Sequence, residues 1–222
     1  MEIKGGGNVE ADRKEILRYL GYGKKEADER INILIDDCML EVQKAASPKV
    51  ITRVFPFKIS TENKLSLNGF EIESKSLSKN LKDCEQVIFF AATLGLGIDQ
   101  LISKYSHFQM SRVVVIQAVA TALLETFCNK QCRKITEEWE EKGFYTRPRF
   151  SPGYGDFPLM FQKELLGSLE ADKKLGIYLT ESLLMTPSKS VSAVIGLSSL
   201  PHRCEVKGCE ICEKKNCIYR RS

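Results

Sequence analysis

Histidine, long apolar runs and a secretion signal are scarce or missing in this sequence of 222 residues. Only two histidines are present, which argues against a Ser/His/Asp catalytic set. The apolar stretches at 87–98 and 113–124 are about a dozen residues long and contain Gln, Thr or Gly, whereas a membrane-spanning helix needs about 20 residues. The N-terminal segment MEIKGGGNVEADRKE lacks the apolar core of a signal peptide. We therefore expect a cytoplasmic protein that does not span a membrane.

Phosphate-binding signatures and a basic surface are also missing. No Walker loop is present, and the Gly95-Leu96-Gly97 segment lacks the rest of a dinucleotide-binding fingerprint. The net charge is +4, of which +3 lies in residues 202–222. The nearly neutral remainder argues against nucleic-acid binding across the whole surface. This shift in composition predicts a main domain at 1–201 and a separate basic, cysteine-rich tail at 202–222.

Apolar periodicity predicts an α+β fold. Helices are expected at 12–22, 24–46, 77–81, 98–105, 108–142 and 159–174, and strands at 50–59, 85–94, 177–179, 183–185 and 191–197. The Asn68-Gly69 pair between two short apolar runs is typical of a tight hairpin. Because the strands come in hairpins rather than in βαβ units, we expect long helices packed on a mainly antiparallel, twisted sheet, followed by an irregular tail.

The loop RFSPGYGDFP, from Arg149 to Pro158, combines an unusual backbone with a charged and an aromatic side chain. An arginine can clamp a carboxylate through two parallel hydrogen bonds, and the face of Tyr154 can attract an onium cation. The plainer interpretation is a stiff surface loop between two helices.

Polar residues also form a stripe on the longest predicted helix. They follow one another at intervals of four residues, and are Gln117, Thr121, Glu125, Asn129 and Arg133. The surrounding sequence VVVIQAVATALLETF is almost wholly apolar, so a carboxylate at Glu125 needs a partner or a ligand. A solvated helix face would explain the same pattern. Cys128 and Cys132, one helical turn apart, are either neighbouring thiols or small buried hydrophobic residues.

The tail contains four of the eight cysteines: Cys204, Cys209, Cys212 and Cys217. Four thiols within fourteen residues predict one tetrahedral metal site. The first three match the C-x4-C-x2-C spacing of plant-type iron–sulfur ferredoxins, and the C-x2-C step equally suits zinc. Free thiols in a flexible tail are the alternative. The other cysteines are expected to be reduced, since no export signal is apparent.

Two motifs together resemble the activation domain family of cobalamin-dependent methionine synthase. The R-x-x-x-G-Y pattern of that family is matched by Arg149, Gly153 and Tyr154. A later LTES…P…SVS pattern is matched by residues 179–182, by Pro187 and by residues 190–192. The resemblance covers roughly residues 84–198. It departs from the family after Tyr154, where Gly155-Asp156 replaces the usual proline.

The resemblance implies binding of S-adenosylmethionine. In such domains the loop arginine, here Arg149, holds the methionyl carboxylate, and the tyrosine, here Tyr154, lies near the sulfonium. Ser151 and Gly153 would then offer backbone contacts, and Glu125 could meet the amino group of the ligand.

The resemblance also implies a repair function without a catalytic base. Such domains present S-adenosylmethionine to cobalamin that has oxidised to the inactive cobalt(II) state, while a one-electron donor supplies an electron. We recognise no cobalamin-binding module in the chain and expect action in trans on a methionine synthase. A hypothesis is that a cluster in the tail passes or gates the electron. The alternatives are a reactivator of another corrinoid methyltransferase and a non-catalytic metal-binding interaction module.

Overall fold

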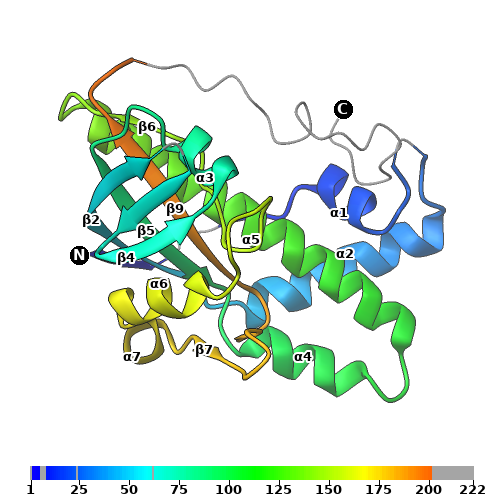
Figure 1. Ribbon diagram of the computed structural model, residues 1–222. Helices are drawn as coiled ribbons and strands as arrows, with labels where there is room; N and C mark the ends of the chain where they lie inside the picture. Colours follow the sequence, from blue (N-terminus) through cyan, green and yellow to red (C-terminus); the bar gives the residue numbers. More distant parts are fainter. Residues whose placement is uncertain (1, 6–8, 24, 62, 202–222) are drawn as a thin grey trace.

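The computed structural model describes residues 2–5, 9–23, 25–61 and 63–201 (Figure 1). The helices are α1 (Arg13–Tyr19), α2 (Glu29–Ala45), α3 (Lys75–Asn80), α4 (Gly97–Tyr105), α5 (Met110–Glu140), α6 (Phe161–Leu169) and α7 (Ala171–Leu175). The strands are β1 (Glu2–Gly5), β2 (Lys49–Thr61), β3 (Lys64–Leu67), β4 (Phe70–Glu73), β5 (Gln86–Thr93), β6 (Tyr145–Thr146), β7 (Tyr178–Leu179), β8 (Met185–Thr186) and β9 (Ser190–Ser198). The predicted α+β class is confirmed.

The main sheet is antiparallel throughout the described residues. Its strand order is β4-β3-β2-β5-β9-β6, and β1 joins by pairing with the first part of β2. Strands β5 and β9 pair over eight residues, from Gln86 opposite Leu197 to Thr93 opposite Ser190. A proline at position 56 suggests the edge of a sheet or a bulge. In the structure, one edge of β2 pairs first with β1 and then with β3, and Pro56 lies between these two pairings.

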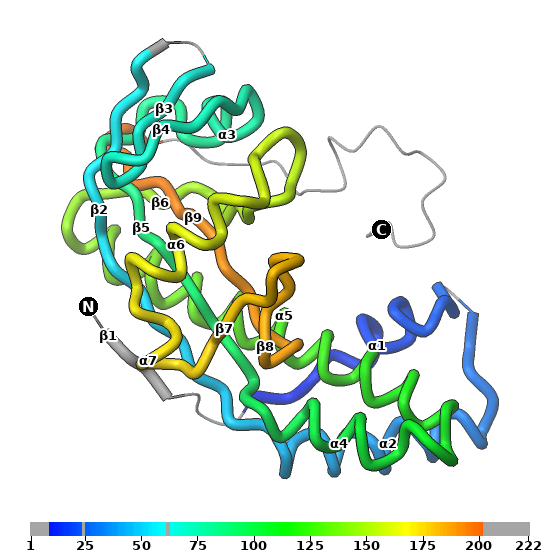
Figure 2. Tube along the Cα trace, turned by 60° about the horizontal axis from the view of Figure 1, so that its bottom comes forward, coloured from blue at the N-terminus to red at the C-terminus, as the bar shows by residue number. Residues whose placement is uncertain are grey.

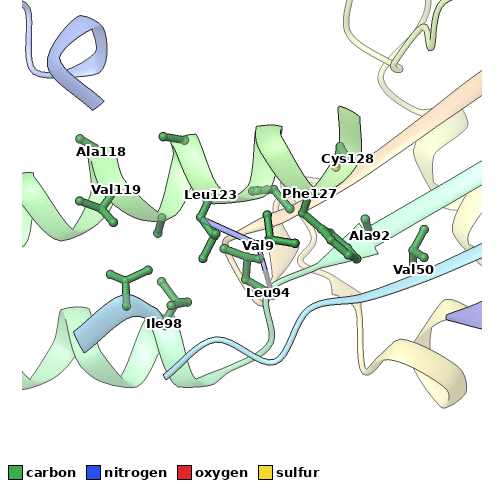
Figure 3. Close-up of a cluster of buried hydrophobic side chains, with 14 of the residues drawn as sticks. Val9, Val50, Ala92, Leu94, Ile98, Ala118, Val119, Leu123, Phe127 and Cys128 are labelled. Carbon is green, nitrogen blue, oxygen red and sulfur yellow. The ribbon is translucent and has the colours of Figure 1, made fainter. Parts of the chain in front are cut away.

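Helices cover both faces of the sheet, so its central strands are buried on both sides. Successive residues of a strand point to opposite faces. Phe90 accordingly packs with α1, α2, α4 and α5, while Phe89 packs with α6 and α7, and both are fully buried. Figure 3 shows Leu123 and Phe127 extending from α5 toward the sheet-side residues around Ala92. This burial on two faces explains why 85–94 is a nearly continuous apolar run rather than an alternating one.

Helix α5 is the long helix expected at 108–142. Within the described part of the chain, it alone has the length and apolar composition that would allow a helix to cross a membrane, and 61% of its most apolar window is buried inside the fold. Its apolar character is therefore accounted for by packing between the sheet and the helices α1, α2 and α4.

Three sequence-based expectations need correction. The helix expected at 159–174 is two helices, because Glu170 adopts a left-handed backbone with φ of 52° between α6 and α7. The helix expected from residue 24 begins at Glu29, where the side chain of Asp28 caps it by accepting from the amide of Ile31. Strand β1 was not expected at all. The Asn68-Gly69 hairpin, by contrast, is confirmed, with positive φ at both residues.

The approach of α4 to α2 yields a stability prediction. A Cβ atom at Gly97 would lie 2.2 Å from the carbonyl oxygen of Ala45, whereas a Cβ at the helical Gly167 would meet nothing within 4 Å. We expect Gly97→Ala to lower the free energy of unfolding by about 1–3 kcal/mol through overpacking. Gly167→Ala should instead raise it, by up to about 1 kcal/mol, through helix propensity. Urea denaturation measures the free energy of unfolding of both variants. A change of the same sign and size in the two would contradict this prediction.

Candidate functional site

An ion pair joins two of the residues that the sequence singled out for ligand binding. Nη2 of Arg149 donates to Oε2 of Glu125 at 2.6 Å, and the two side chains are 19% and 27% exposed. Glu125 comes from the middle of α5, and Arg149 comes from the loop that follows β6. The structure thus brings the candidate carboxylate and the candidate guanidinium together, and neither is fully shielded from solvent.

Two thiols lie beside the guanidinium of Arg149. Burial raises the pKa of Cys128 to about 12, and it also raises the pKa of Cys132, although the positive charge of Arg149 acts in the opposite direction. Both cysteines are free. The thiols are therefore neutral neighbours, and Nη1 of Arg149 is buried without a hydrogen bond to any oxygen or nitrogen of the described residues. A buried donor of this kind is stabilised when an oxygen acceptor reaches it.

The backbone of the loop 149–158 is held in a tight fold. Phe150 exchanges two backbone hydrogen bonds with Val194 of β9, at 2.8 and 2.9 Å. Gly153, with a φ of 90°, donates to the carbonyl of Phe157 at 2.9 Å, and the amide of Tyr154 donates to the carbonyl of Ser151 at 3.1 Å. A positive φ of this kind favours glycine, which explains the residue before the tyrosine.

Asp156 ties the far end of this loop to α3. Its carboxylate accepts from the hydroxyl of Ser74 at 2.6 Å and from the amides of Lys75 and Ser76 at 2.7 and 3.0 Å. The preceding Gly155 has a φ of 55°, and a Cβ there would lie 2.8 Å from Oγ of Ser76. The Gly155-Asp156 pair, which departs from the family pattern, is thus a second anchor for the loop.

Tyr154 projects from the loop with 66% of its surface exposed. Its ring lies 6.3 Å from that of Phe150, measured between centroids. Other large apolar side chains exposed on the loop, on the start of α6 and on the β7–β8 hairpin are Leu159, Met160, Tyr178 and Leu184. The hairpin is joined to α6 by a hydrogen bond of 2.9 Å from Nε2 of Gln162 to the carbonyl oxygen of Leu183. Figure 2 shows the loop and the hairpin on the same side of the molecule as α1.

The rest of the polar stripe on α5 divides into two kinds of residue. Gln117, Asn129 and Arg133 are exposed, as expected of a solvated helix face. Thr121, one turn before Glu125, instead accepts a hydrogen bond of 3.0 Å from Nζ of Lys189. Sequence reasoning missed Lys189, although it lies inside the matched P…SVS segment, because nothing in the sequence places that segment beside α5.

The predicted metal ligands Cys204, Cys209, Cys212 and Cys217 lie outside the described residues, so the tail site stays a prediction. Within residues 2–5, 9–23, 25–61 and 63–201, no group of three or more His, Cys, Asp or Glu side chains could hold a metal ion. Ser190 and Ser192 of the SVS segment are buried. The hydroxyl oxygen of Ser190 lies 2.9 Å from that of Thr93, and the hydroxyl of Ser192 donates to Gln162 at 3.4 Å, so both side chains stabilise the fold.

Comparison with known proteins identifies the family of the chain. Residues 57–206 match the family described as vitamin B12 dependent methionine synthase, activation domain. The chain belongs to this family. The match covers more than half of the chain and includes the loop 149–158, α5 and the segment up to β9.

A solved structure shows the same fold. It is described as the MetH reactivation domain bound to AdoHcy, and the two structures superpose with a TM-score of 0.60 at 18% sequence identity. The alignment covers 91% of this chain and 80% of the other. None of the curated proteins matches significantly. The likeness extends to the N-terminal part of the chain, which the family match leaves out.

The anchor at Asp156 has a pH-dependent consequence. The hydrogen bond from Ser74, with those from the amides of Ser76 and Lys75, holds the pKa of Asp156 well below its ordinary value. Such a carboxylate stabilises the fold above the unfolded-state pKa of about 3.9, and this stabilisation is lost as the pH falls further. Asp156→Asn should therefore cost about 1 kcal/mol or less at pH 7, as for an exposed cap.

Urea denaturation at pH 7 and pH 3 measures this effect, and the difference between wild type and Asp156→Asn should narrow at the lower pH. Glu71→Gln, at an exposed position on β4, is the control and should change stability little at either pH. A difference at Asp156 that is independent of pH would show that the carboxylate charge is not what stabilises the loop.

Proposed function

We propose that this chain binds S-adenosylmethionine and presents its methyl group to the cobalamin of a methionine synthase, so that inactive cob(II)alamin is methylated reductively. Membership of the activation domain family supports this proposal. The MetH reactivation domain, which has the same fold, was solved with AdoHcy, the demethylated form of the proposed methyl donor. The observation that carries the proposal is the partly buried ion pair between Arg149 and Glu125.

This ion pair suits the amino-acid end of the ligand. A zwitterion bears a carboxylate and an ammonium on the same carbon, so it can enter between Arg149 and Glu125 and give each an oppositely charged partner. The exchange leaves no buried charge unpaired, which would otherwise cost several kcal/mol. Nη1 of Arg149, which has no oxygen or nitrogen partner in the described residues, can then supply the second bond of a bidentate clamp.

The loop would position the sulfonium, at the other end of the methionyl group. The exposed ring of Tyr154 follows Arg149 by five residues and offers a face to the sulfonium, to which aromatic rings are attracted electrostatically. The backbone of Ser151 and Gly153 lies in the same turn, within the hydrogen bonds that fix the loop. We assign Arg149, Ser151, Gly153, Tyr154 and Glu125 to the ligand on this basis.

The reaction needs positioning rather than a base. An electron from a one-electron donor converts cobalt(II) of the partner to cobalt(I), whose electron pair then attacks the methyl carbon. The bond from that carbon to sulfur breaks, and its electrons stay on sulfur, so S-adenosylhomocysteine leaves. No proton moves. The protein therefore contributes by holding the sulfonium in line with the metal of the partner.

Exposed apolar residues on the segments that follow the loop 149–158 suit docking of the cobalamin protein. Leu159, Met160 and Leu184 are 43%, 64% and 67% exposed, and they belong to the loop, α6 and hairpin region that borders the ligand site. Grouped apolar side chains of this kind mark contact surfaces. We propose that the partner is a separate protein and that residues 1–201 form the domain that docks on it.

Removal of Arg149 should abolish tight ligand binding. We expect Arg149→Ala to weaken S-adenosylmethionine binding by at least about 30-fold, because losing one partner of a buried charge pair costs about 2–5 kcal/mol. Arg149→Lys keeps the charge but loses the planar fork of donors. Its affinity for S-adenosylmethionine should therefore lie between those of the wild type and Arg149→Ala. Arg133→Ala, at an exposed position on α5, is the matched control. Isothermal titration calorimetry, with thermal unfolding to confirm folding, measures all four proteins.

Formation of methylcobalamin tests the function itself. Mixing the chain with cob(II)alamin methionine synthase, S-adenosylmethionine and a reductant should produce the methylcobalamin spectrum, and Arg149→Ala should suppress it. Ligand binding without methylation would point to another corrinoid methyltransferase as the partner. Absence of ligand binding by the wild type would refute the proposed function and favour an interaction module.

We further propose that Cys204, Cys209, Cys212 and Cys217 bind one metal centre, either an iron–sulfur cluster or zinc, in a separate tail at 202–222. The neighbouring lysines and arginines would offset the charge of four thiolates. Anaerobic reconstitution with iron and sulfide, followed by metal analysis and EPR, should show a reducible cluster that is lost when the cysteines are replaced by serine. Stoichiometric zinc without a redox change would exclude electron transfer through the tail.

A further inference from the structure

Lys189 directly precedes β9, and hydrogen bonds fix its backbone. Its carbonyl oxygen accepts from the amide of Leu94 at 2.9 Å and from the hydroxyl of Thr93 at 3.4 Å. The next residue, Ser190, donates from its hydroxyl to the carbonyl of Pro187 at 2.7 Å. The backbone on both sides of Lys189 is therefore fixed to the end of β5 and to its own loop. From this anchored backbone the side chain extends to Thr121 on the polar face of α5.

The ammonium of Lys189 uses one of its N–H donors, and its partner is a neutral hydroxyl. Nζ donates to Oγ1 of Thr121 at 3.0 Å, and the side chain is half-buried. In the described part of the chain, no carboxylate lies within ion-pair distance of this ammonium. Burial lowers the pKa of Lys189, and the negative charge of Asp99 acts against this effect only from farther away. An ammonium carries three N–H donors, so two remain. A partly desolvated cation of this kind is stabilised by an additional acceptor.

The position of Thr121 relates Lys189 to the proposed ligand site. Thr121 and Glu125 are four residues apart on one face of α5, which corresponds to about one helical turn, or about 5.4 Å along the axis. The carbonyl of Gln117 accepts from Thr121 Oγ1 at 2.7 Å, so the threonine is oriented to accept from Lys189. Lys189 and Arg149 thus bring cationic groups to consecutive turns of the same helix face.

We propose that Lys189 donates to the ribose hydroxyl oxygens of S-adenosylmethionine, and so determines the orientation of the adenosyl part. The inference rests on the proposed function, which puts the amino-acid end at Glu125 and Arg149. The two methylene groups and the sulfur between the α-carbon and the ribose span a length comparable to one helical turn. A ligand that extends along α5 from Glu125 toward Thr121 therefore brings its ribose to Lys189.

A thermodynamic cycle between the protein and the ligand tests this contact. S-adenosylmethionine and its 2′,3′-dideoxy analogue are titrated by calorimetry into the wild type and into Lys189→Met, which keeps the aliphatic length of the side chain. Loss of a hydrogen bond to a charged group should weaken binding of S-adenosylmethionine to Lys189→Met about tenfold or more. The wild type should bind the dideoxy analogue more weakly than S-adenosylmethionine by a similar factor. Replacing Lys189 by Met should then reduce the affinity for the analogue little further.

Controls separate this contact from effects on folding and from the proposed function. Lys44→Met, at an exposed position near the end of α2, should bind both ligands as the wild type does. Lys189→Arg should recover part of the lost affinity, and thermal unfolding should stay close to that of the wild type for each variant. Rescue by arginine would not be expected if the residue only filled space.

Two results would overturn the proposal. If Lys189→Met binds both ligands as tightly as the wild type does, Lys189 does not contact the ligand. If the effects of Lys189→Met and of the missing hydroxyls simply add, Lys189 contacts something other than the ribose. A wild type that binds no S-adenosylmethionine would instead refute the proposed function, and Lys189 would then have no ligand to orient.

Discussion

Packing of α5 across the paired strands β5 and β9 is the constraint on which the other features of the molecule depend. Strand β9 directly follows Lys189 and, through Val194, holds Phe150 beside Arg149. Helix α5 lies on the same sheet with its apolar side toward Phe90 and Ala193. The polar stripe is consequently turned away from the sheet, and Glu125 within it meets Arg149 of the loop 149–158. A shift of α5 by one residue would rotate Glu125 by about 100° and remove it from Arg149.

The loop owes its shape to anchors at both of its ends. Backbone bonding of Phe150 to β9 extends the sheet by one bridge, and Asp156 caps α3 at the other end. Between them, positive φ angles at Gly153 and Gly155 turn the chain so that Tyr154 points outward. Rigid anchors with a short, exposed turn between them are suited to a binding loop, because little conformational entropy remains to be lost when a ligand arrives.

The electrostatic character of the site follows from partial burial. Arg149 and Glu125 neutralise each other in the free protein. Burial lowers the pKa of Arg149, but the negative charge of Glu125 acts against this effect, and the pKa lies above its ordinary value. Neutral thiols beside the guanidinium do not supply a nucleophile. A zwitterionic ligand can thus exchange one balanced arrangement for another, which fits a protein whose proposed task is to hold a reactive methyl donor rather than to act on it.

Local patterns in the sequence were sufficient to predict many of the helices, strands and turns. Apolar periodicity predicted α5, β5 and β9, because their faces are set by neighbours three, four or two residues away, and the Asn68-Gly69 pair predicted its hairpin. The pattern from Arg149 to Tyr154 indicated a ligand loop. The break at Glu170, strand β1 and the contact of Lys189 with Thr121 could not be predicted in this way. Each depends on packing or on partners far along the chain, 68 residues away for Lys189. The sequence by itself therefore determined which chemical groups this protein has and which local structures carry them, whereas only the tertiary structure decided which groups meet, because the pairing of β5 with β9 and the packing of α5 bring distant segments together.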